Sequence, residues 1–329
     1  MLVGLLADPL GRRLGLLDRP DPKGGRKLHA RPTPLVGGFA VVAATLSGLF
    51  LPDVSTGLAI GWFGVIVLGM FLVGLLDDRF ELSAPFRFLF AAGLMLLAIL
   101  QVSDFRIWFL FFQGQQQLVL LPGLLGIGFT LVCLLGFLNA VNMADGKDGL
   151  VIGQALIWTL ALMVRLPAEQ LPLLAAIAGS LAVLFLFNMK GKLFLGDSGS
   201  YGVSAIFGLL AVHAWNNGFD RMRADDVAVI FALPVFDTLR LIAHRLLSGK
   251  TPFTPGRDHL HHYLYARWGW PRPLPWVLAL VALPNLGAIM LPGTGLLWLG
   301  VSFAGYIGLL WVATRTAPAA GGPLAGTGT

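Results

Sequence analysis

Charged residues are scarce in this chain. Asp, Glu, Lys and Arg make up 12% of its 329 residues, whereas hydrophobic residues make up 56%. The mean hydropathy is +0.78. One soluble core of this length could not bury so much apolar material. The low charge therefore excludes an ordinary soluble domain and indicates that lipid surrounds most of the chain.

Cysteine is nearly absent. The single residue, Cys133, lies inside an apolar segment, so no intrachain disulfide can form. Cysteine usage therefore does not indicate whether the compartment is oxidising or reducing. The chain also lacks an internal repeat, and residues 1–10 lack the charged start of a secretion signal. These ten residues are too short to span a membrane and are expected to form an interfacial stub.

The chain has no basic stripe with interleaved aromatic residues on a soluble domain, which argues against a nucleic-acid partner. Its net charge is nevertheless +6. Anionic lipid headgroups and an anionic substrate explain that charge better.

Long apolar runs predict the fold. Taking about 20 apolar residues as one span, we expect an all-α integral membrane protein, a polytopic bundle of about ten transmembrane helices. It would form one domain, 1–316, and the Ala/Gly/Pro-rich tail, 317–329, would be disordered. The ten predicted spans are 35–51, 57–76, 86–101, 122–142, 150–166, 171–189, 199–215, 225–247, 275–291 and 295–315.

The loops alternate in charge. With the N-terminus inside, 19 of the 23 Lys and Arg residues fall on the cytoplasmic side, because Lys and Arg are retained there. Four fall outside, namely Arg106, Arg165, Arg221 and Arg223. One missed span would invert every later loop, so this asymmetry supports the topology.

Four polar or glycine-rich loops emerge on the cytoplasmic side: 77–78, 139–149, 196–200 and 257–262. Loops far apart in sequence need a shared reason to be polar on one face, and a single active site supplies it.

Asp77 and Asp78 end an apolar span, where the helix dipole disfavours carboxylates, so a functional role is indicated. The alternative is a solvated helix end that pairs with Arg79 or Arg87.

Oxygen ligands recur at three-residue spacing in the next loop, and on helical turns they would share a face. They are Asn139, Asn142, Asp145 and Asp148. Asp148 could instead cap the helix that starts near Leu150.

Residues 196–200, Gly-Asp-Ser-Gly-Ser, precede a span, so their backbone N–H groups could form an anion-binding nest, with Asp197 holding a metal. A plain turn with an N-cap is the alternative.

His259, His261 and His262, beside Arg257 and Asp258, suit contacts to a phosphate or a base better than a zinc site. Two isolated residues have simpler explanations. Asp237 would form a buried ion pair with Arg240, with direct catalysis as the alternative, and His213 near the outer face is expected to be incidental.

Several acids and amides together favour a hard, oxygen-ligated cation, most often Mg²⁺, with Mn²⁺ as an alternative. Phosphoryl transfer follows, because such a metal neutralises phosphate charge while cationic side chains position donor and acceptor.

Five segments resemble one family, in family order, from about residue 10 to 265. They are Arg-Lys-Leu-His-Ala-Arg-Pro-Thr-Pro-Leu-Val-Gly-Gly at 26–38, Leu-Asp-Asp-Arg at 76–79 with Leu-Ser at 82–83, Asn-Ala-Val-Asn-Met-Ala-Asp-Gly-Lys-Asp-Gly-Leu at 139–150, Phe-Leu-Gly-Asp-Ser-Gly-Ser at 194–200, and Pro-Gly-Arg-Asp-His-Leu-His-His at 255–262. The sequence thereby resembles the polyprenyl-phosphate N-acetylhexosamine-1-phosphate transferase superfamily, glycosyltransferase family 4. The histidine segment is most similar to the bacterial undecaprenyl-phosphate N-acetylglucosamine-1-phosphate transferases.

The resemblance implies transfer of a sugar 1-phosphate from a UDP-sugar to undecaprenyl phosphate, for cell-envelope polysaccharide synthesis. It implies a catalytic group of Asp77, Asp78 and Asp148, and metal contacts from Asn142 and Asp197. It implies that substrate is bound by Lys27, Asp145, His259, His261 and His262, and the neighbouring cations Lys147 and Arg257 are expected to bind substrate as well. Whether an aspartate deprotonates the lipid phosphate or forms a covalent intermediate is left open, as is a homo-oligomer.

The chain departs from the family pattern twice. A full helix usually precedes the first motif, whereas here a ten-residue stub does, which implies a late start or a reduced bundle. Lys147 stands where an apolar residue is usual, and it could pair with Asp145 or touch phosphate.

The competing interpretation is a non-catalytic polyprenyl-phosphate binding or transport protein. Transporters place polar groups near the midplane, whereas these acids lie at one interface, and an inactive relative would be expected to lose Asp77, Asp78 or Asp197.

Overall fold

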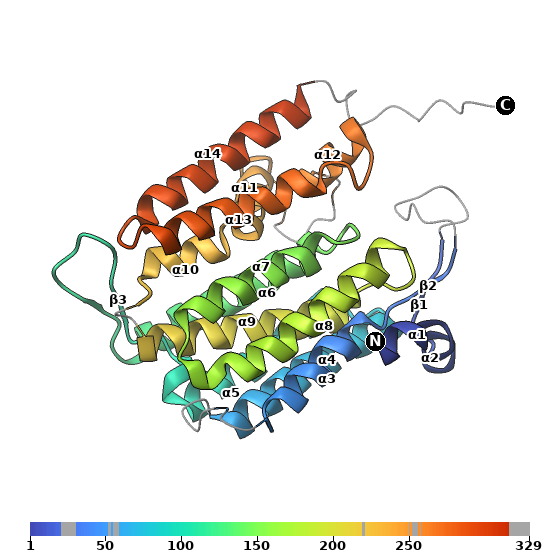
Figure 1. Cartoon of the computed structure of the whole chain (residues 1–329), viewed down its shortest axis with the longest axis horizontal. Helices are drawn as coiled ribbons and strands as arrows, with labels where there is room; N and C mark the ends of the chain where they lie inside the picture. Colours follow the sequence, from blue (N-terminus) through green and yellow to red (C-terminus); the bar gives the residue numbers. More distant parts are fainter. Residues whose placement is uncertain are drawn as a thin grey trace.

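The computed structural model describes residues 1–20, 31–51, 54, 59–218, 221–249, 251, 256 and 258–315. Helices dominate these residues (Figure 1). The strands among them form two short antiparallel hairpins, β1 (Leu17–Asp18) with β2 (Thr33–Pro34), and β3 (Phe109–Leu110) with β4 (Val119–Leu120). The predicted disordered tail lies outside the described residues.

Fourteen α-helices follow one another along the described residues. They are α1 (Leu2–Leu5), α2 (Ala7–Leu14), α3 (Gly37–Gly48), α4 (Ile60–Phe80), α5 (Ala84–Gln101), α6 (Gly123–Ala144), α7 (Leu150–Arg165), α8 (Leu171–Met189), α9 (Gly196–Gly218), α10 (Ala224–Ile230), α11 (Ala232–Leu247), α12 (Leu260–Trp268), α13 (Leu274–Met290) and α14 (Gly295–Thr314). The predicted interfacial stub forms α1 and the start of α2.

Nine of the ten predicted spans coincide with one helix each, and one prediction is wrong. The expected single span 225–247 consists of α10 and α11, which are bent by 82° where they meet. Pro234 supplies a physical reason, because its missing N–H leaves the carbonyl of Ile230 without a helical partner. Hydropathy alone does not register this break.

By length and composition, five helices of the described chain could cross a membrane, or six if the bent pair is one span. The five are Ile60–Phe80, Ala84–Gln101, Gly123–Ala144, Ala168–Met189 and Gly295–Thr314, while Gly37–Gly48, Leu150–Arg165 and Leu274–Met290 are apolar but shorter. These helices fit an all-α membrane protein.

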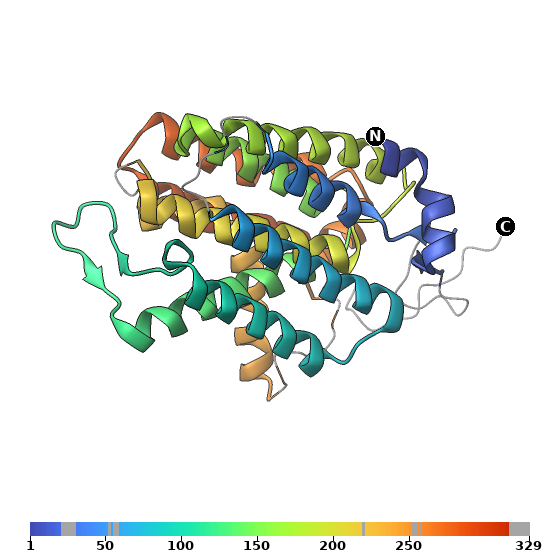
Figure 2. The same cartoon turned by 90° about the horizontal axis from the view of Figure 1, so that it is seen from below.

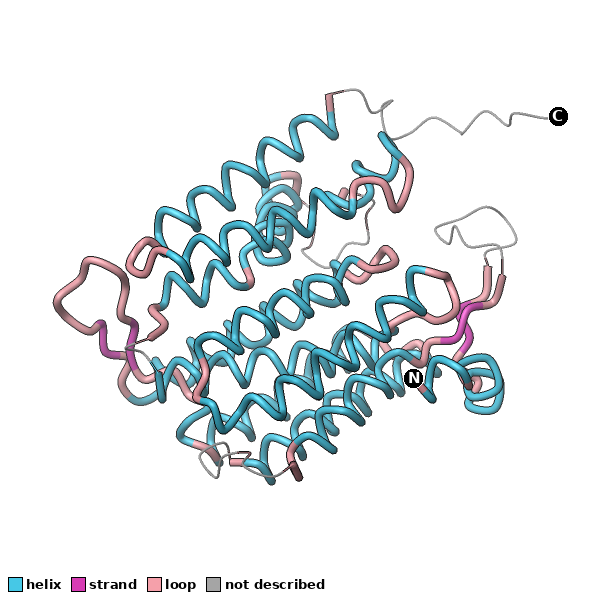
Figure 3. The backbone as a smooth tube through the Cα atoms, viewed as in Figure 1, coloured by secondary structure: helices cyan, strands magenta, loops and turns pink. Residues whose placement is uncertain are grey.

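The long helices run back and forth, so that their connections gather at two ends of the molecule (Figure 3). The α6–α7 turn, the α8–α9 connection, the β1–β2 hairpin and α12 lie at one end, which we call the site end (Figure 1). The β3–β4 hairpin marks the opposite end. Arg165 lies there, 3.8 Å from Asp226, and so does Arg223, 3.8 Å from the ring centroid of Phe111.

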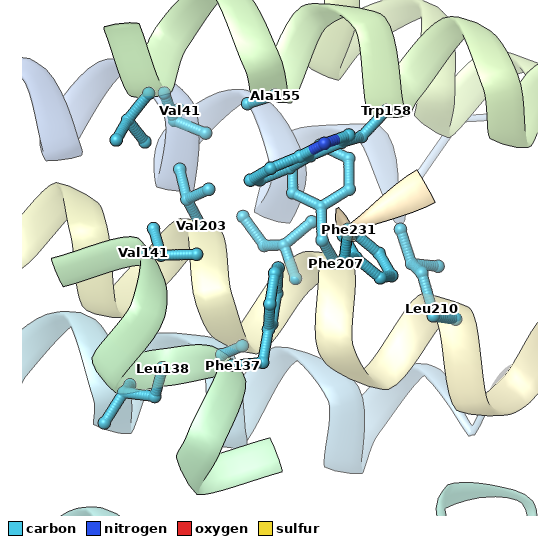
Figure 4. Close-up of a cluster of buried hydrophobic side chains, with 14 of the residues drawn as sticks. Val41, Phe137, Leu138, Val141, Ala155, Trp158, Val203, Phe207, Leu210 and Phe231 are labelled. Atoms are coloured by element: carbon cyan, nitrogen blue, oxygen red, sulfur yellow. The ribbon is translucent and has the colours of Figure 1, made fainter. Parts of the chain in front are cut away.

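Helix α9 is the centre of the bundle and packs against α3, α4, α6 and α7. Aromatic side chains from four helices or their junctions fill the core beside it (Figure 4). The indole of Trp158 is fully buried, and its centroid lies 5.3 to 5.6 Å from the rings of Phe137, Phe207 and Phe231. This packing stabilises the helices whose ends build the site. Helix α11 leaves the bundle direction (Figure 2).

Candidate active site

Asp78 at the end of α4 caps the start of α9. Its carboxylate accepts hydrogen bonds from the backbone N–H groups of Asp197, at 2.8 Å, and Ser198, at 2.9 Å. First-turn N–H groups have no partner within their own helix and attract anions. The predicted anion-binding nest is therefore present, but in this structure the anion bound there is the side chain of Asp78.

Gly196 is required at this contact for two reasons. Its φ of +75° lies in the left-handed region, and a Cβ atom would come within 2.8 Å of the Asp78 carboxylate. Gly74 acts similarly, because a Cβ on it would overlap the backbone of Asp197. Glycines thus allow α4 and α9 to approach each other until the carboxylate reaches the helix start.

Asp77 is buried and forms an ion pair with Arg87. The pairing considered as an alternative for Asp77 is therefore present, whereas Arg79 donates to the carbonyl of Leu14 instead. The Arg87 guanidinium also lies 3.7 Å from the Asp197 carboxylate, so one cation serves two acids.

Asn142 and Asp197, the predicted metal ligands, are in contact. The amide nitrogen of Asn142 lies 2.6 Å from Oδ1 of Asp197 and 3.1 Å from the hydroxyl of Ser200. Asn139 is not part of this group, because its amide donates to the carbonyl of Leu135 within α6. Asn139 and Asn142 both lie on α6, whereas the expected shared helical face is wrong for Asp145 and Asp148, because α6 ends at Ala144 and these two aspartates lie in the turn after it.

Asp148 does not cap α7, contrary to the alternative considered for it. The N-cap is Gly149, without a side-chain capping bond. Asn188 at the end of α8 stabilises the turn instead: its Oδ1 accepts from the N–H of Gly149 at 2.6 Å, and its Nδ2 lies 3.4 Å from Oδ1 of Asp148. Its Nδ2 also donates to the carbonyl of Leu193 at 2.9 Å, so this one amide joins both connecting loops.

A cavity of about 540 Å³ lies between these elements at the site end. Five of its lining side chains are carboxyl groups, those of Asp18, Asp78, Asp145, Asp148 and Asp197. Among the described residues that line it, the one Lys or Arg is Lys147, whose Nζ lies 4.0 Å from the ring centroid of Tyr265. The cavity therefore carries surplus negative charge.

Asp145 follows the last residue of α6. The pKa of its carboxyl is raised to about 8, mainly by burial, with the nearby carboxylates of Asp78 and Asp148 acting in the same direction. Perturbed acids in a cavity are typical of functional sites.

The histidines form a layer beside the cavity. Nδ1 of His259 lies 2.9 Å from Oδ2 of Asp237, and the rings of His261 and His262 are 4.2 Å apart. His261 packs on Gly146, where a Cβ would overlap its ring. Burial lowers the pKa of the His261 imidazole well below its usual range, and positive charge on His262 and His259 acts in the same direction.

The predicted ion pair of Asp237 and Arg240 is confirmed, at 2.9 Å. Asp237 also accepts from the hydroxyl of Tyr306 at 3.0 Å, so it connects the histidine layer to α14. At the opposite end, His213 contacts Gln170 at 2.8 Å and takes no part in the cavity. Lys27 and Arg257 lie outside the described residues.

Sequence reasoning missed four polar or aromatic residues of this site: Asp18, Asn188, Tyr265 and Trp270. Asn188 is a single amide at the end of an apolar span. Burying an amide without a hydrogen-bond partner is unfavourable, and this is the sequence signal that could have identified it. Trp270 donates its indole N–H to the carbonyl of Asp148 at 2.9 Å. Nothing in its sequence position indicates that contact.

Within the described residues, no three His, Cys, Asp or Glu side chains form a ligand set for a metal ion. A Mg²⁺ ion does not need such a set, because it commonly uses one or two carboxylates, several waters and substrate phosphates. Asp197 with Asn142, beside the uncompensated charge of the cavity, is a donor set of that kind.

The comparisons agree with this geometry. The model of glycosyl transferase family 4 matches residues 60–214, which contain α4, the α6–α7 turn and most of α9. The chain belongs to this family. It is 30% identical, over 81% of its length and 75% of the relative, to a probable undecaprenyl-phosphate N-acetylglucosaminyl 1-phosphate transferase of Bacillus subtilis.

Two further relatives are named undecaprenyl-phosphate alpha-N-acetylglucosaminyl 1-phosphate transferase. The one from Escherichia coli K12 is 30% identical over 86% of this chain and 78% of the relative. The one from Salmonella typhi is 31% identical over 88% of this chain and 78% of the relative.

Proposed function

We propose that this protein transfers a sugar 1-phosphate, N-acetylhexosamine 1-phosphate, from a UDP-sugar to undecaprenyl phosphate. The products are a pyrophosphate-linked lipid and UMP. The observation that carries the proposal is the convergence of carboxyl groups from α4, the α6–α7 turn and the start of α9 on one cavity. Family membership and the names of the relatives support the same reaction.

The reaction exchanges one phosphoanhydride bond for another. An oxygen of the lipid phosphate attacks the phosphorus that carries the sugar, and the bond from that phosphorus to the oxygen of UMP breaks. A phosphate monoester is mostly ionised near neutral pH, since its second pKa is about 6. Alignment and neutralisation of charge therefore matter more than deprotonation of the attacking oxygen.

A divalent cation, Mg²⁺ or Mn²⁺, suits the surplus of carboxylates. We assign it to Asp197 and Asn142, with the Asn142 amide turned so that its oxygen faces the ion. When bound, the ion would neutralise the phosphates and hold them in place. Arg87 and the backbone N–H groups at the start of α9 keep Asp197 and Asp78 in position.

Asp78, Asp145, Lys147 and Asp148 line the cavity, whereas Asp77 and the histidine layer lie beside it. Asp77 is buried and paired, so we assign it to positioning Arg87 beside the reacting groups. Asp78 and Asp148 line the cavity and are assigned to the reacting phosphates. Asp145, Lys147 and the layer of His259, His261 and His262 are assigned to the donor. Lys27 and Arg257, outside the described residues, are proposed to attract substrate phosphates.

The lipid chain needs an apolar site. A second cavity, of about 500 Å³, is lined almost wholly by apolar side chains of α6, α9, α10 and α11. It reaches Ala140, two residues before Asn142. We assign the isoprenoid chain of undecaprenyl phosphate to it.

We further propose ten membrane crossings, counting α10 with α11 as one, in a single domain of the bacterial inner membrane. The site end would face the cytoplasm, where UDP-sugars are made available. The distribution of Lys and Arg supports this orientation, since 19 of 23 belong to that side in the predicted topology.

The test is release of UMP. Purified protein with Mg²⁺, undecaprenyl phosphate and a panel of UDP-sugars, UDP-N-acetylglucosamine first, is expected to release UMP. Asp197→Ala should abolish it, by at least about 100-fold. Asp8→Ala is the matched control, because Asp8 forms an exposed ion pair with Arg12 on α2. Folded protein that binds the lipid and releases no UMP from any donor would instead support the non-catalytic alternative.

A further inference from the structure

One wall of the polar cavity carries an ammonium group and two aromatic rings. Lys147 comes from the α6–α7 turn, Tyr265 from α12 and Trp270 from the segment after α12. The Lys147 ammonium lies 4.0 Å from the ring centroid of Tyr265. A cation over an aromatic face is held by the ring's quadrupole. Residues from two distant segments thus form one surface, which we call the aromatic wall.

Trp270 presents mainly hydrocarbon to the cavity. Its one polar atom, Nε1, donates to the carbonyl of Asp148 at 2.9 Å. That hydrogen bond holds the ring against the α6–α7 turn and satisfies the one polar group of the side chain. The aromatic wall therefore combines the apolar surface of two rings with one ammonium group, inside a cavity otherwise dominated by carboxyl groups.

The groups around the wall indicate what could bind there. Asp145 and Asp148 carry oxygen atoms that accept hydrogen bonds. A UDP-sugar offers two rings, the planar uracil and the puckered sugar. Uracil has two carbonyl oxygens that need donors and one N–H that donates, whereas the sugar has several donating hydroxyls and apolar C–H faces. A rim of acceptors around an aromatic surface thus suits the sugar better than the base.

We propose that Tyr265 and Trp270 form the subsite for the sugar ring of the donor. Lys147, held by Tyr265, donates to an acceptor oxygen of the sugar or of its phosphate. This proposal rests on the proposed function and deepens it, since it assigns the recognition of the sugar to residues that the family motifs do not include.

The test compares equilibrium binding of UDP-N-acetylglucosamine with that of UDP, which lacks the sugar. Trp270→Leu is expected to weaken binding of the UDP-sugar by about tenfold and binding of UDP by less than about twofold. Trp270→Phe keeps a ring but loses the hydrogen bond to Asp148, and it should retain most of the preference. Trp268→Leu is the matched control, because Trp268 does not line the cavity.

Tyr265→Leu is a second variant that avoids a folding defect, since the Tyr265 side chain is 37% exposed. It should also lower the preference for the UDP-sugar. Equal losses for UDP and UDP-sugar would overturn the proposal and assign the wall to uracil. Damage from Trp270→Phe as great as from Trp270→Leu would show that Trp270 only positions Asp148. Wild-type protein that binds no UDP-sugar would refute the proposed function itself.

Discussion

Replacing Asp78 by Asn should destabilise the protein even without substrate. The carboxylate accepts two backbone hydrogen bonds at the start of α9, at 2.8 and 2.9 Å. A hydrogen bond to a charged group contributes about 1.5–3 kcal/mol. An amide keeps one acceptor oxygen and turns its NH₂ toward the other N–H. After allowing for the lower cost of burying a neutral side chain, we expect a net loss of about 2–4 kcal/mol.

The assay is thermal unfolding in detergent at one scan rate, followed by tryptophan fluorescence, with EDTA and without substrate. For a large domain, a loss of 2–4 kcal/mol lowers the apparent Tm by roughly 3–8 °C. Asp8→Asn, which removes only the exposed pair with Arg12, should change the Tm by about 1 °C or less. If Asp78→Asn shifted the Tm no more than this control, the idea that Asp78 holds α9 in place would be refuted.

Three further predictions follow from the packing, the charge and the one cysteine. Gly74→Ala should lower the apparent Tm, at a cost of about 1–3 kcal/mol in stability, because its Cβ overlaps the α9 backbone. Gly61→Ala on the same helix meets nothing within 4 Å and should be neutral or mildly stabilising. Equal Tm values for the two variants would contradict this prediction. The pKa of Asp145 is raised to about 8, so its stabilising contribution is complete below the unfolded pKa of about 4 and is lost as pH rises through 8. In EDTA, the Tm of wild type minus the Tm of Asp145→Asn should therefore fall between pH of about 5 and pH of about 9. A difference in Tm that stays constant over this range would count against the prediction. Cys133 lines the apolar cavity, so undecaprenyl phosphate should slow its modification by a membrane-permeant thiol reagent at least about threefold, an effect that UDP-sugar alone should not produce.

Much of the fold was predictable because membrane helices are selected by a property that single residues carry. The nine helices that coincide with predicted spans are each visible as an apolar run, and successive helices then run in opposite directions. The bend between α10 and α11 was not predicted, since Pro234 changes hydrogen bonding while leaving hydropathy almost unchanged.

The candidate site was predictable where several polar residues crowd one loop. Asp145, Lys147 and Asp148 lie within four residues of the sequence, and the structure places all three on one cavity. Asn188 and Trp270 were missed because each acts alone, through a contact with a loop about 40 or 120 residues away. Sequence spacing carries no information about such contacts. The pairing of Asp78 with the start of α9 was missed for the same reason.

The start of α9 is clamped by three neighbours: Asp78 of α4, Asn142 of α6, and Gly38 of α3, where a Cβ would come within 2.6 Å of the backbone at Gly199. A helix start that is held by three neighbouring helices is expected to move little. For the proposed reaction, we therefore expect the nucleotide to leave at the other boundary, where Trp270 meets the α6–α7 turn through one hydrogen bond. Rates of turnover should thus respond to substitutions along that outer rim even when the chemical step is untouched.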